Sequence, residues 1–397
     1  MSYIEFQTNS RYIQCENALS EIRRYTHGMG ENYLIVTGCG AITKSVEETV
    51  RESFESGMES KCNPELIKTN FKYAANIDRA REYDAQNIEF KYSFVNVEGN
   101  QCSLSNIKKL VSIAGDRNAD VIIGIGGGKC LDLVRGVSYF RPVRVVLCPT
   151  SHASNASGSG ITMVYNDEGV VVDKWFMPVL PELVIADLSV LLKAPYHMLS
   201  AGIGDGIACN RESLALFQAM GLREAIPDNA WYTSEAIIRA LLENGRDAVK
   251  AAREKVLNHA FISVLPCILN ACGSIRSFRS DFIPHLMDEV LLQFEGSNGV
   301  MHGHRVGYAV IPEMVYESAP LPEIHDYIDF CLDIGIPVDF AGLNIPDISY
   351  EELYKAAEIM LEGNTAKSVP LKLKPEDFAN CAIQANQIVS GYLGRFS

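Results

Sequence analysis

Three consecutive glycines follow an apolar run in the segment Val121–Asp132, and a lysine comes directly after them. The run Val121–Ile125 carries no polar side chain, as expected for a parallel strand that is buried on both faces. Glycines just past such a strand let the backbone approach a ligand closely, because no Cβ stands in the way. A helical pattern opens at Lys129, and the free N–H groups of a helix start favour an anionic group such as a pyrophosphate. The segment therefore predicts a phosphate-binding loop, with a tight turn as the alternative; its spacing matches neither G-x-G-x-x-G nor the Walker pattern.

Three side chains in the second half of the chain are of types that bind metal ions. Asp205 lies among small residues at a predicted helix start, where an N-cap is its alternative role. His285 follows Pro284 at the opening of a helical run, and His302 leads into an apolar helix. One carboxylate and two imidazoles make an open zinc site, because three protein ligands leave a fourth position for water or substrate. Such an ion stabilises an alkoxide or polarises a carbonyl, so a phosphate loop beside it suits a nicotinamide dehydrogenase acting on alcohols.

The elements that would position these residues differ between the two halves of the chain. Short apolar runs alternate with helical patterns in the first half, which predicts βαβ units and a mainly parallel sheet. Longer helical periodicities begin near residue 189, and a polar segment over 61–85 indicates a surface insertion. We therefore predict an α/β, Rossmann-like dinucleotide-binding domain over 1–188 and an all-α metal-binding domain over 189–397. The predicted strands span 33–38, 89–95, 121–125 and 143–148, and the predicted helices 45–54, 105–114, 233–243, 259–271 and 351–361.

Composition limits the partners of the chain. Its 397 residues suffice for a sizeable core, and the net charge of −14 disfavours binding to nucleic acid or to an anionic membrane. The 11 cysteines show no paired C-x-x-C spacing, which is typical of a reducing compartment. No apolar window approaches ~18 residues, and the first residues lack a signal-peptide pattern. We expect a cytoplasmic protein with no membrane partner.

These motifs resemble those of the glycerol dehydrogenase branch of the iron-containing alcohol dehydrogenase superfamily, along nearly the whole chain. Residues 124–132 resemble the family's G-[IV]-G-G-G-K-x-L-D loop, which holds the NAD pyrophosphate, and residues 201–205 its A-G-I-G-D segment, whose aspartate binds zinc. His302 begins a match to the H-G-x-x-V segment that supplies a histidine ligand, and His285 falls where the other histidine is expected. Two further segments, over 317–320 and 335–338, resemble the family's E-N-A-P and G-[LI]-P motifs.

The resemblance implies a dehydroquinate synthase-like fold and a homo-oligomeric enzyme that interconverts a small alcohol or polyol with its ketone or aldehyde. It implies Zn²⁺, with Fe²⁺ as the alternative, bound by Asp205, His285 and His302, and hydride exchange with NAD or NADP. The implied cofactor contacts are Gly126, Gly127, Gly128, Lys129, Asp132, Thr150, Ser159, Ile161 and Tyr165.

The cofactor and substrate segments depart from the family pattern. The first strand is followed by Thr-Gly-Cys-Gly over 37–40, without the acid that bonds the adenosine ribose, so both NAD and NADP stay open. Lys44 is either a partner for a 2′-phosphate or an exposed lysine. Asn155 stands where glycerol dehydrogenases carry an aspartate that contacts the polyol; it can bond a hydroxyl but carries no charge, which makes glycerol a doubtful substrate. His152 in the same loop either binds an anionic group or is an ordinary polar-loop residue.

The predicted metal shell also departs from the family pattern. Cys209 stands four residues after Asp205, where the iron-dependent branch carries a histidine, and this favours three-ligand zinc over four-ligand iron. Cys209 itself is either a thiolate ligand or a small buried residue. Asp281 is an alternative donor one turn ahead of His285, and His304 is a candidate for a proton relay.

Three other functions are weighed against this one. A glycerol-1-phosphate dehydrogenase-like reductase of a phosphorylated ketone would use Arg276 and Arg279 for the phosphate, unless these are solvated surface residues. A non-redox cyclase resembling dehydroquinate synthase is disfavoured, because residues 155–160 lack that family's D-S-S-V-G-G-K pattern. A non-catalytic, cofactor-bound sensor is disfavoured by the presence of all three implied metal ligands.

Overall fold

The computed structural model describes residues 10–38, 44–55, 90–96, 101–166, 169, 171–270 and 281–394. Contacts divide this part of the chain into two compact units. The first unit extends as far as Ser151 and resumes over Ala156–Ala194; the second comprises His152–Asn155 and the chain from Pro195 onward. The predicted insertion over 61–85, the residues 39–40 after the first strand, the side chain of Lys44, and Arg276 and Arg279 lie outside the described residues.

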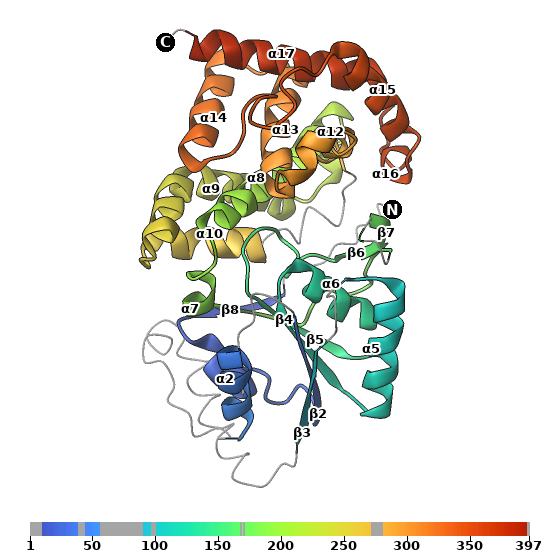
Figure 1. Ribbon diagram of the computed structural model, residues 1–397, viewed down its shortest axis with the longest axis vertical. Helices are drawn as coiled ribbons and strands as arrows, with labels where there is room; N and C mark the ends of the chain where they lie inside the picture. Colours follow the sequence, from blue (N-terminus) through green and yellow to red (C-terminus); the bar gives the residue numbers. More distant parts are fainter. Residues whose placement is uncertain are drawn as a thin grey trace. The chain divides into compact units, whose positions relative to one another are not determined.

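A six-stranded sheet with every neighbouring pair parallel forms the centre of the first unit (Figure 1). Its order is β1-β8-β5-β4-β2-β3, so the mainly parallel sheet predicted from the alternating pattern is confirmed. β4 is buried at every position, which explains its uninterrupted apolar sequence. The strands are β1 (Arg11–Cys15), β2 (Asn32–Thr37), β3 (Lys91–Asn96), β4 (Val121–Gly126), β5 (Arg144–Pro149) and β8 (Leu183–Asp187).

Helices cover both faces of this sheet, and alternate strand residues point to the two sides. Ile35 packs on the side of α1 (Ile22–Tyr25) and α2 (Lys44–Glu55), whereas its neighbour Leu34 packs on the side of α5 (Leu104–Asp116) and α6 (Gly128–Val137) (Figure 1). The 3-10 helix η1 (Ala18–Glu21), α7 (Leu188–Leu191) and a separate antiparallel pair, β6 (Ile161–Tyr165) with β7 (Val171–Phe176), complete the unit.

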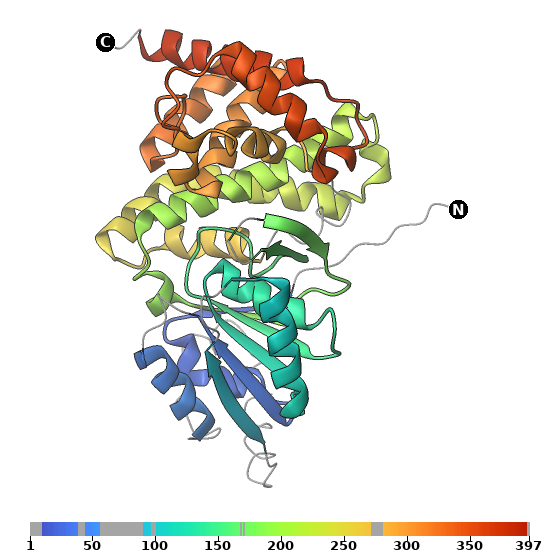
Figure 2. The ribbon, with the colours of Figure 1, turned by 45° about the vertical axis from the view of Figure 1, so that its right-hand side comes forward.

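The described residues of the second unit are all helical or irregular, as the predicted all-α domain requires. Figure 2 shows its helices packed side by side, and one apolar cluster joins residues of α8, α12, α13, α15 and α17. No described helix combines the length and apolarity needed to span a membrane. The α-helices are α8 (Tyr196–Ala219), α9 (Asp228–Glu254), α10 (His259–Leu269), α12 (Ile283–Leu291), α13 (His302–Tyr316), α14 (Leu321–Ile334), α15 (Tyr350–Leu361), α16 (Asn364–Lys367) and α17 (Pro375–Leu393), with 3-10 helices η3 (Arg223–Ala225) and η4 (Glu295–Gly299).

Glycines bring α8 and α13 into backbone contact. A Cβ on Gly204 would overlap the carbonyl oxygen of Gly303, and one on Gly303 would overlap the carbonyl oxygen of Ala201. Only glycine therefore allows this helix spacing. The prediction that Asp205 opens a helix is wrong, because Asp205 lies in the middle of α8. Each glycine around Asp205 disfavours an isolated helix by about 1 kcal/mol, but here the glycines allow α13 to pack closely against α8.

The crossing gives a direct test by substitution. In Gly303→Ala the added Cβ must push α8 and α13 apart, so we expect a loss of at least about 1–3 kcal/mol in the free energy of unfolding. Gly299→Ala is the matched control, because a Cβ at that position meets no atom within 4 Å. Urea unfolding of both variants checks this, and equal stabilities would contradict the tight crossing.

Candidate metal centre and phosphate loop

The structure brings the three predicted metal ligands together from three helices. Asp205 on α8 places its Oδ1 atom 3.8 Å from Nε2 of His285 on α12 and 3.9 Å from Nε2 of His302 on α13. The two imidazole centroids lie 5.4 Å apart. Asp205 is buried, whereas the side chain of His302 is 45% exposed, so the group is open to solvent on the His302 side. This arrangement is suited to a divalent cation.

A buried carboxylate orients each histidine. Nδ1 of His285 lies 2.9 Å from Oε2 of Glu212, and Nδ1 of His302 lies 2.9 Å from Oδ2 of Asp288. A carboxylate at Nδ1 fixes the proton there and leaves Nε2 as the free donor atom, which is the usual arrangement behind metal-binding histidines. Sequence reasoning missed both carboxylates. Their signal is helical spacing, since Glu212 comes seven residues after Asp205 and Asp288 three after His285.

The electrostatics of this group favour a positive charge. Burial by itself lowers the pKa of His285, but the Glu212 carboxylate and Cys209 outweigh it and hold that pKa well above its ordinary value. Burial raises the pKa of Asp288, but His302 and Arg305 together lower it by more, so the pKa of Asp288 is below its ordinary value. The buried carboxylates thus attract either protons or a metal ion to the imidazoles.

Cys209 and Asn155 contact the same group. The Sγ atom of Cys209 lies 3.2 Å from Oδ1 of Asp205 and 3.8 Å from Nε2 of His285. The backbone N–H of Asn155 donates to Oδ2 of Asp205 at 3.0 Å, and its side-chain amide donates to Sγ of Cys209 at 3.2 Å. Asn155 therefore lies against the ligand candidates, while its contact with a substrate stays a prediction.

Three further residues that the sequence suggested for the site also lie in the helical unit. Asp281 is buried and forms a second cluster with Glu212 and His285, their ligand atoms all within 4.8 Å of one another. His152 is fully buried in its loop, with its ring centroid 6.0 Å from that of Phe261, and its role in binding an anionic group stays a prediction. Nε2 of His304 lies 2.8 Å from Oγ of Ser200, and burial lowers the pKa of His304 to about 4. Its role in a proton relay stays a prediction.

The glycine segment forms an open turn between β4 and α6. A Cβ on Gly126 would lie 2.7 Å from Cβ of Cys130, so the close packing of α6 requires that glycine. A Cβ on Gly127 would meet no atom of the described chain within 4 Å, which leaves that side of the helix start open to a ligand. The exposed Lys129 lies nearby, with Nζ 5.0 Å from the ring centroid of Tyr165.

Asp132 forms a buried ion pair within the protein. It is buried and pairs with Arg135, Oδ1 to the guanidinium at 2.7 Å, while burial raises the pKa of Asp132 to about 6. Arg135 also donates to the carbonyl oxygens of Ala156 and Ile161 and so holds the segment that carries Ser159. Direct contact of the cofactor with Asp132, Thr150, Ser159 and Ile161 stays a prediction.

Sequence reasoning missed an acid at the end of the first predicted strand. The hydroxyl of Thr37, the last residue of β2, donates to Oε1 of Glu47 at 2.7 Å. Glu47 belongs to α2, ten residues further along the chain, and therefore lies outside residues 37–40, where the family pattern has its ribose-binding acid. A carboxylate is thus present at the carboxyl end of β2.

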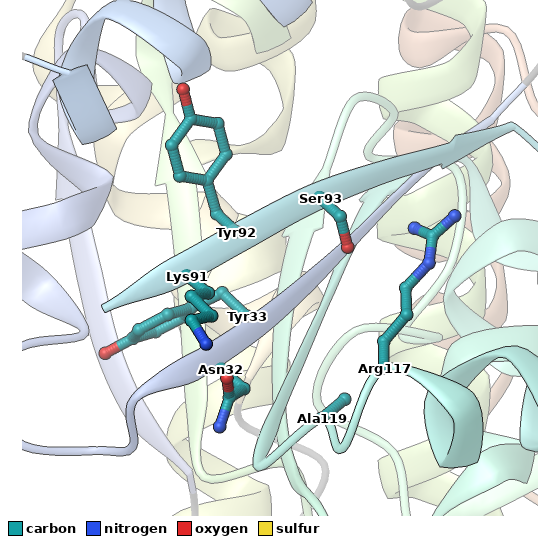
Figure 3. Close-up of a pocket in the computed structure, with 7 residues that line it drawn as sticks. All are labelled: Asn32, Tyr33, Lys91, Tyr92, Ser93, Arg117 and Ala119. Atoms are coloured by element: carbon teal, nitrogen blue, oxygen red, sulfur yellow. The ribbon is translucent and has the colours of Figure 1, made fainter. Parts of the chain in front are cut away.

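A surface pocket of about 300 Å³ lies at the opposite end of the sheet (Figure 3). Asn32 and Lys91, which line it, begin β2 and β3, and Ala119 precedes β4. Ligands of parallel sheets bind beyond the carboxyl ends of the strands, so this pocket is not the nucleotide site.

The carboxylate behind His285 gives a test of the metal centre. Glu212→Gln keeps the size of the side chain but weakens the bond to Nδ1, so we expect metal affinity to fall by about 10–100-fold. Chelator competition with Zn²⁺ measures the affinity, and circular dichroism checks the fold. Glu317→Gln, which removes a carboxylate bound to Arg211, is the matched control. An unchanged affinity in Glu212→Gln would contradict the assignment.

Comparison with known proteins agrees with the fold. A family model described as iron-containing alcohol dehydrogenase matches residues 66–195. A glycerol dehydrogenase of Escherichia coli is 25% identical over 398 residues, covering 98% of each chain. A glycolaldehyde reductase of Halobacterium salinarum is 25% identical, covering 96% of this chain and 97% of its own. The crystal structure of glycerol dehydrogenase from Schizosaccharomyces pombe has a TM-score of 0.81 at 19% identity, covering 100% of this chain and 93% of that one, which confirms the predicted fold.

Proposed function

We propose that the chain is an alcohol dehydrogenase of the glycerol dehydrogenase-like branch of the iron-containing alcohol dehydrogenase superfamily. In this proposal it uses a divalent metal and NAD to interconvert a small alcohol or polyol with its ketone or aldehyde. The observation that carries this proposal is the convergence of Asp205, His285 and His302, with a buried carboxylate behind each histidine.

We propose Zn²⁺ as the metal, with Fe²⁺ as the alternative. The donor set fits either ion, because imidazole and carboxylate bind both, while the sulfur of Cys209 beside it favours zinc. Bound there, the ion would supply a Lewis acid for the substrate oxygen. Glu212 and Asp288 contribute by holding both Nε2 atoms toward Asp205 before any ligand arrives, so that little reorganisation is needed on binding.

The open turn at Gly127 is proposed to receive the cofactor pyrophosphate. The helix start of α6 offers N–H groups, and the exposed ammonium of Lys129 supplies a positive charge in a chain of net charge −14. NAD(P) bound there would supply the hydride acceptor. Arg135 keeps the segment from Ala156 to Ile161 in place through its two carbonyl contacts, and so positions Ser159.

Glu47 favours NAD over NADP. A carboxylate at the carboxyl end of the first strand of such folds accepts a hydrogen bond from the ribose 2′-hydroxyl and repels a 2′-phosphate. The bond from Thr37 holds Glu47 at that end of β2. A homo-oligomeric state and a cytoplasmic location remain predictions from the sequence.

The proposal is tested by following the absorbance of reduced nicotinamide with zinc-loaded protein. The panel consists of glycerol, dihydroxyacetone, glycolaldehyde, a 2-oxo acid and dihydroxyacetone phosphate, with NAD(H) and NADP(H). We expect turnover of at least one unphosphorylated pair and its loss in Asp205→Ala, which removes a metal ligand but leaves cofactor binding intact. Turnover of the phosphorylated ketone alone would favour the phosphate-reductase alternative. Full activity in Asp205→Ala would overturn the proposed metal site.

The phosphate loop is tested separately by cofactor binding. In Gly127→Ala the new Cβ projects into open space, so stability changes by less than about 1 kcal/mol while the pyrophosphate is blocked. We expect the affinity for NADH, measured by fluorescence, to fall at least about tenfold, which corresponds to about 1.4 kcal/mol. Gly126→Ala provides the contrast, because its Cβ would strike Cys130 and lower stability first. Undiminished NADH affinity in Gly127→Ala would place the cofactor elsewhere.

Coenzyme preference tests Glu47. Glu47→Gln removes the negative charge that opposes a 2′-phosphate, so kcat/KM with NADPH should rise relative to that with NADH by at least about tenfold. Glu52→Gln on the same helix is the control, because Glu52 is exposed on α2, whereas Glu47 accepts the hydrogen bond from Thr37. An unchanged ratio would remove Glu47 from the ribose site.

A further inference from the structure

We propose that Cys209 is a fourth protein ligand of the metal, so that the site is formed by one carboxylate, one thiolate and two imidazoles. The inference rests on the proposed metal-dependent function and extends it. Cys209 lies four residues after Asp205 on α8, and residues at this spacing share one face of a helix. Within the described residues, the ligand atoms of Asp205, Cys209 and His285 all lie within 4.8 Å of one another.

The separations between these atoms match those of a tetrahedral zinc site. With Zn–S near 2.3 Å and Zn–N or Zn–O near 2.0 Å, neighbouring ligand atoms of a tetrahedron are about 3.3–3.5 Å apart. The sulfur of Cys209 is 3.2 Å from Oδ1 of Asp205 and 3.8 Å from Nε2 of His285. Asp205 Oδ1 in turn is 3.8 Å from His285 Nε2 and 3.9 Å from His302 Nε2. Shifts of a few tenths of an ångström would place the ligand atoms of Asp205, Cys209 and His285 around one ion, and His302 approaches the same oxygen of Asp205 from α13.

Asn155 prepares the sulfur for this role. Its side-chain amide donates to Sγ of Cys209 at 3.2 Å, and such a contact from a neighbouring group orients a ligand atom. The backbone N–H of the same residue binds Oδ2 of Asp205, which leaves Oδ1 for the ion. Among the described residues, no other cysteine belongs to a cluster of metal-ligand atoms.

A thiolate ligand changes the character of the site. Together with the Asp205 carboxylate it balances the charge of a divalent ion, and soft sulfur selects Zn²⁺ over harder ions such as Mg²⁺ and Mn²⁺. Zinc also accommodates a fifth ligand, so four protein ligands do not exclude the substrate.

The test uses the full-length protein, stripped of metal with a chelator and reloaded with Co²⁺ as a spectroscopic probe. A cobalt–thiolate bond produces a charge-transfer absorption in the near ultraviolet that nitrogen and oxygen ligands do not produce. We expect this absorption in the wild type and in Cys267→Ser, a cysteine of α10 outside the cluster. It should disappear in Cys209→Ser while one Co²⁺ remains bound, and Zn²⁺ affinity should fall at least about tenfold, since even residues behind the ligands cost 10–100-fold.

A measurement on the wild type alone avoids any folding defect of the variant. Zinc-edge X-ray absorption should detect one sulfur near 2.3 Å beside nitrogen and oxygen near 2.0–2.1 Å. A shell without sulfur, or a cobalt absorption that survives in Cys209→Ser, overturns the thiolate ligand. Failure of the proposed function is distinguishable from this outcome, because it would appear as a wild type that binds no stoichiometric metal or as an Asp205→Ala variant that binds it equally well.

Discussion

The backbone contact between Gly204 of α8 and Gly303 of α13 determines where the metal-site side chains can stand. Asp205 follows the first of these glycines and His302 precedes the second, so the distance between the two helices sets the distance between the two donor groups. Each glycine weakens its own helix in isolation, and burial of neighbouring apolar residues such as Ile203 and Val306 offsets that cost. Helix stability and site geometry are thus linked at one place in the fold.

The carboxylates behind the histidines add an electrostatic constraint to this geometric one. Glu212 and Asp288 are buried, and a buried charge is costly unless a partner of opposite charge faces it. The partners of Asp288 are Arg305 and the imidazole of His302, and the partner of Glu212 is the imidazole of His285. Several buried carboxylates therefore lie close together near the site. A cation that binds beside them in the folded protein also stabilises the fold.

The sequence predicted those parts of the fold that depend on local pattern. β4 and the glycine turn were evident because a strand buried on both faces has no polar position, and the long helices of the second unit because their periodicity is regular. Asp205 was misplaced at a helix start, since glycines predict a break unless a second helix packs against them. Glu212, Asp288 and Glu47 went unnoticed because each acquires its role only from a side chain brought to it by folding. The ligand set itself came from the family resemblance; spacing alone left each residue with an ordinary structural alternative.

Residues His152–Asn155 pack with the helical unit, although the chain on either side of them belongs to the sheet unit. The helical unit is therefore not one continuous stretch of sequence. A gene fragment that begins at Pro195 would encode Asp205 and Cys209 but not the donor that contacts both of them. Recombination between related genes at that boundary would likewise separate the ligand helix from its partner loop, so exchanged segments must either match at residues 152–155 or carry them along.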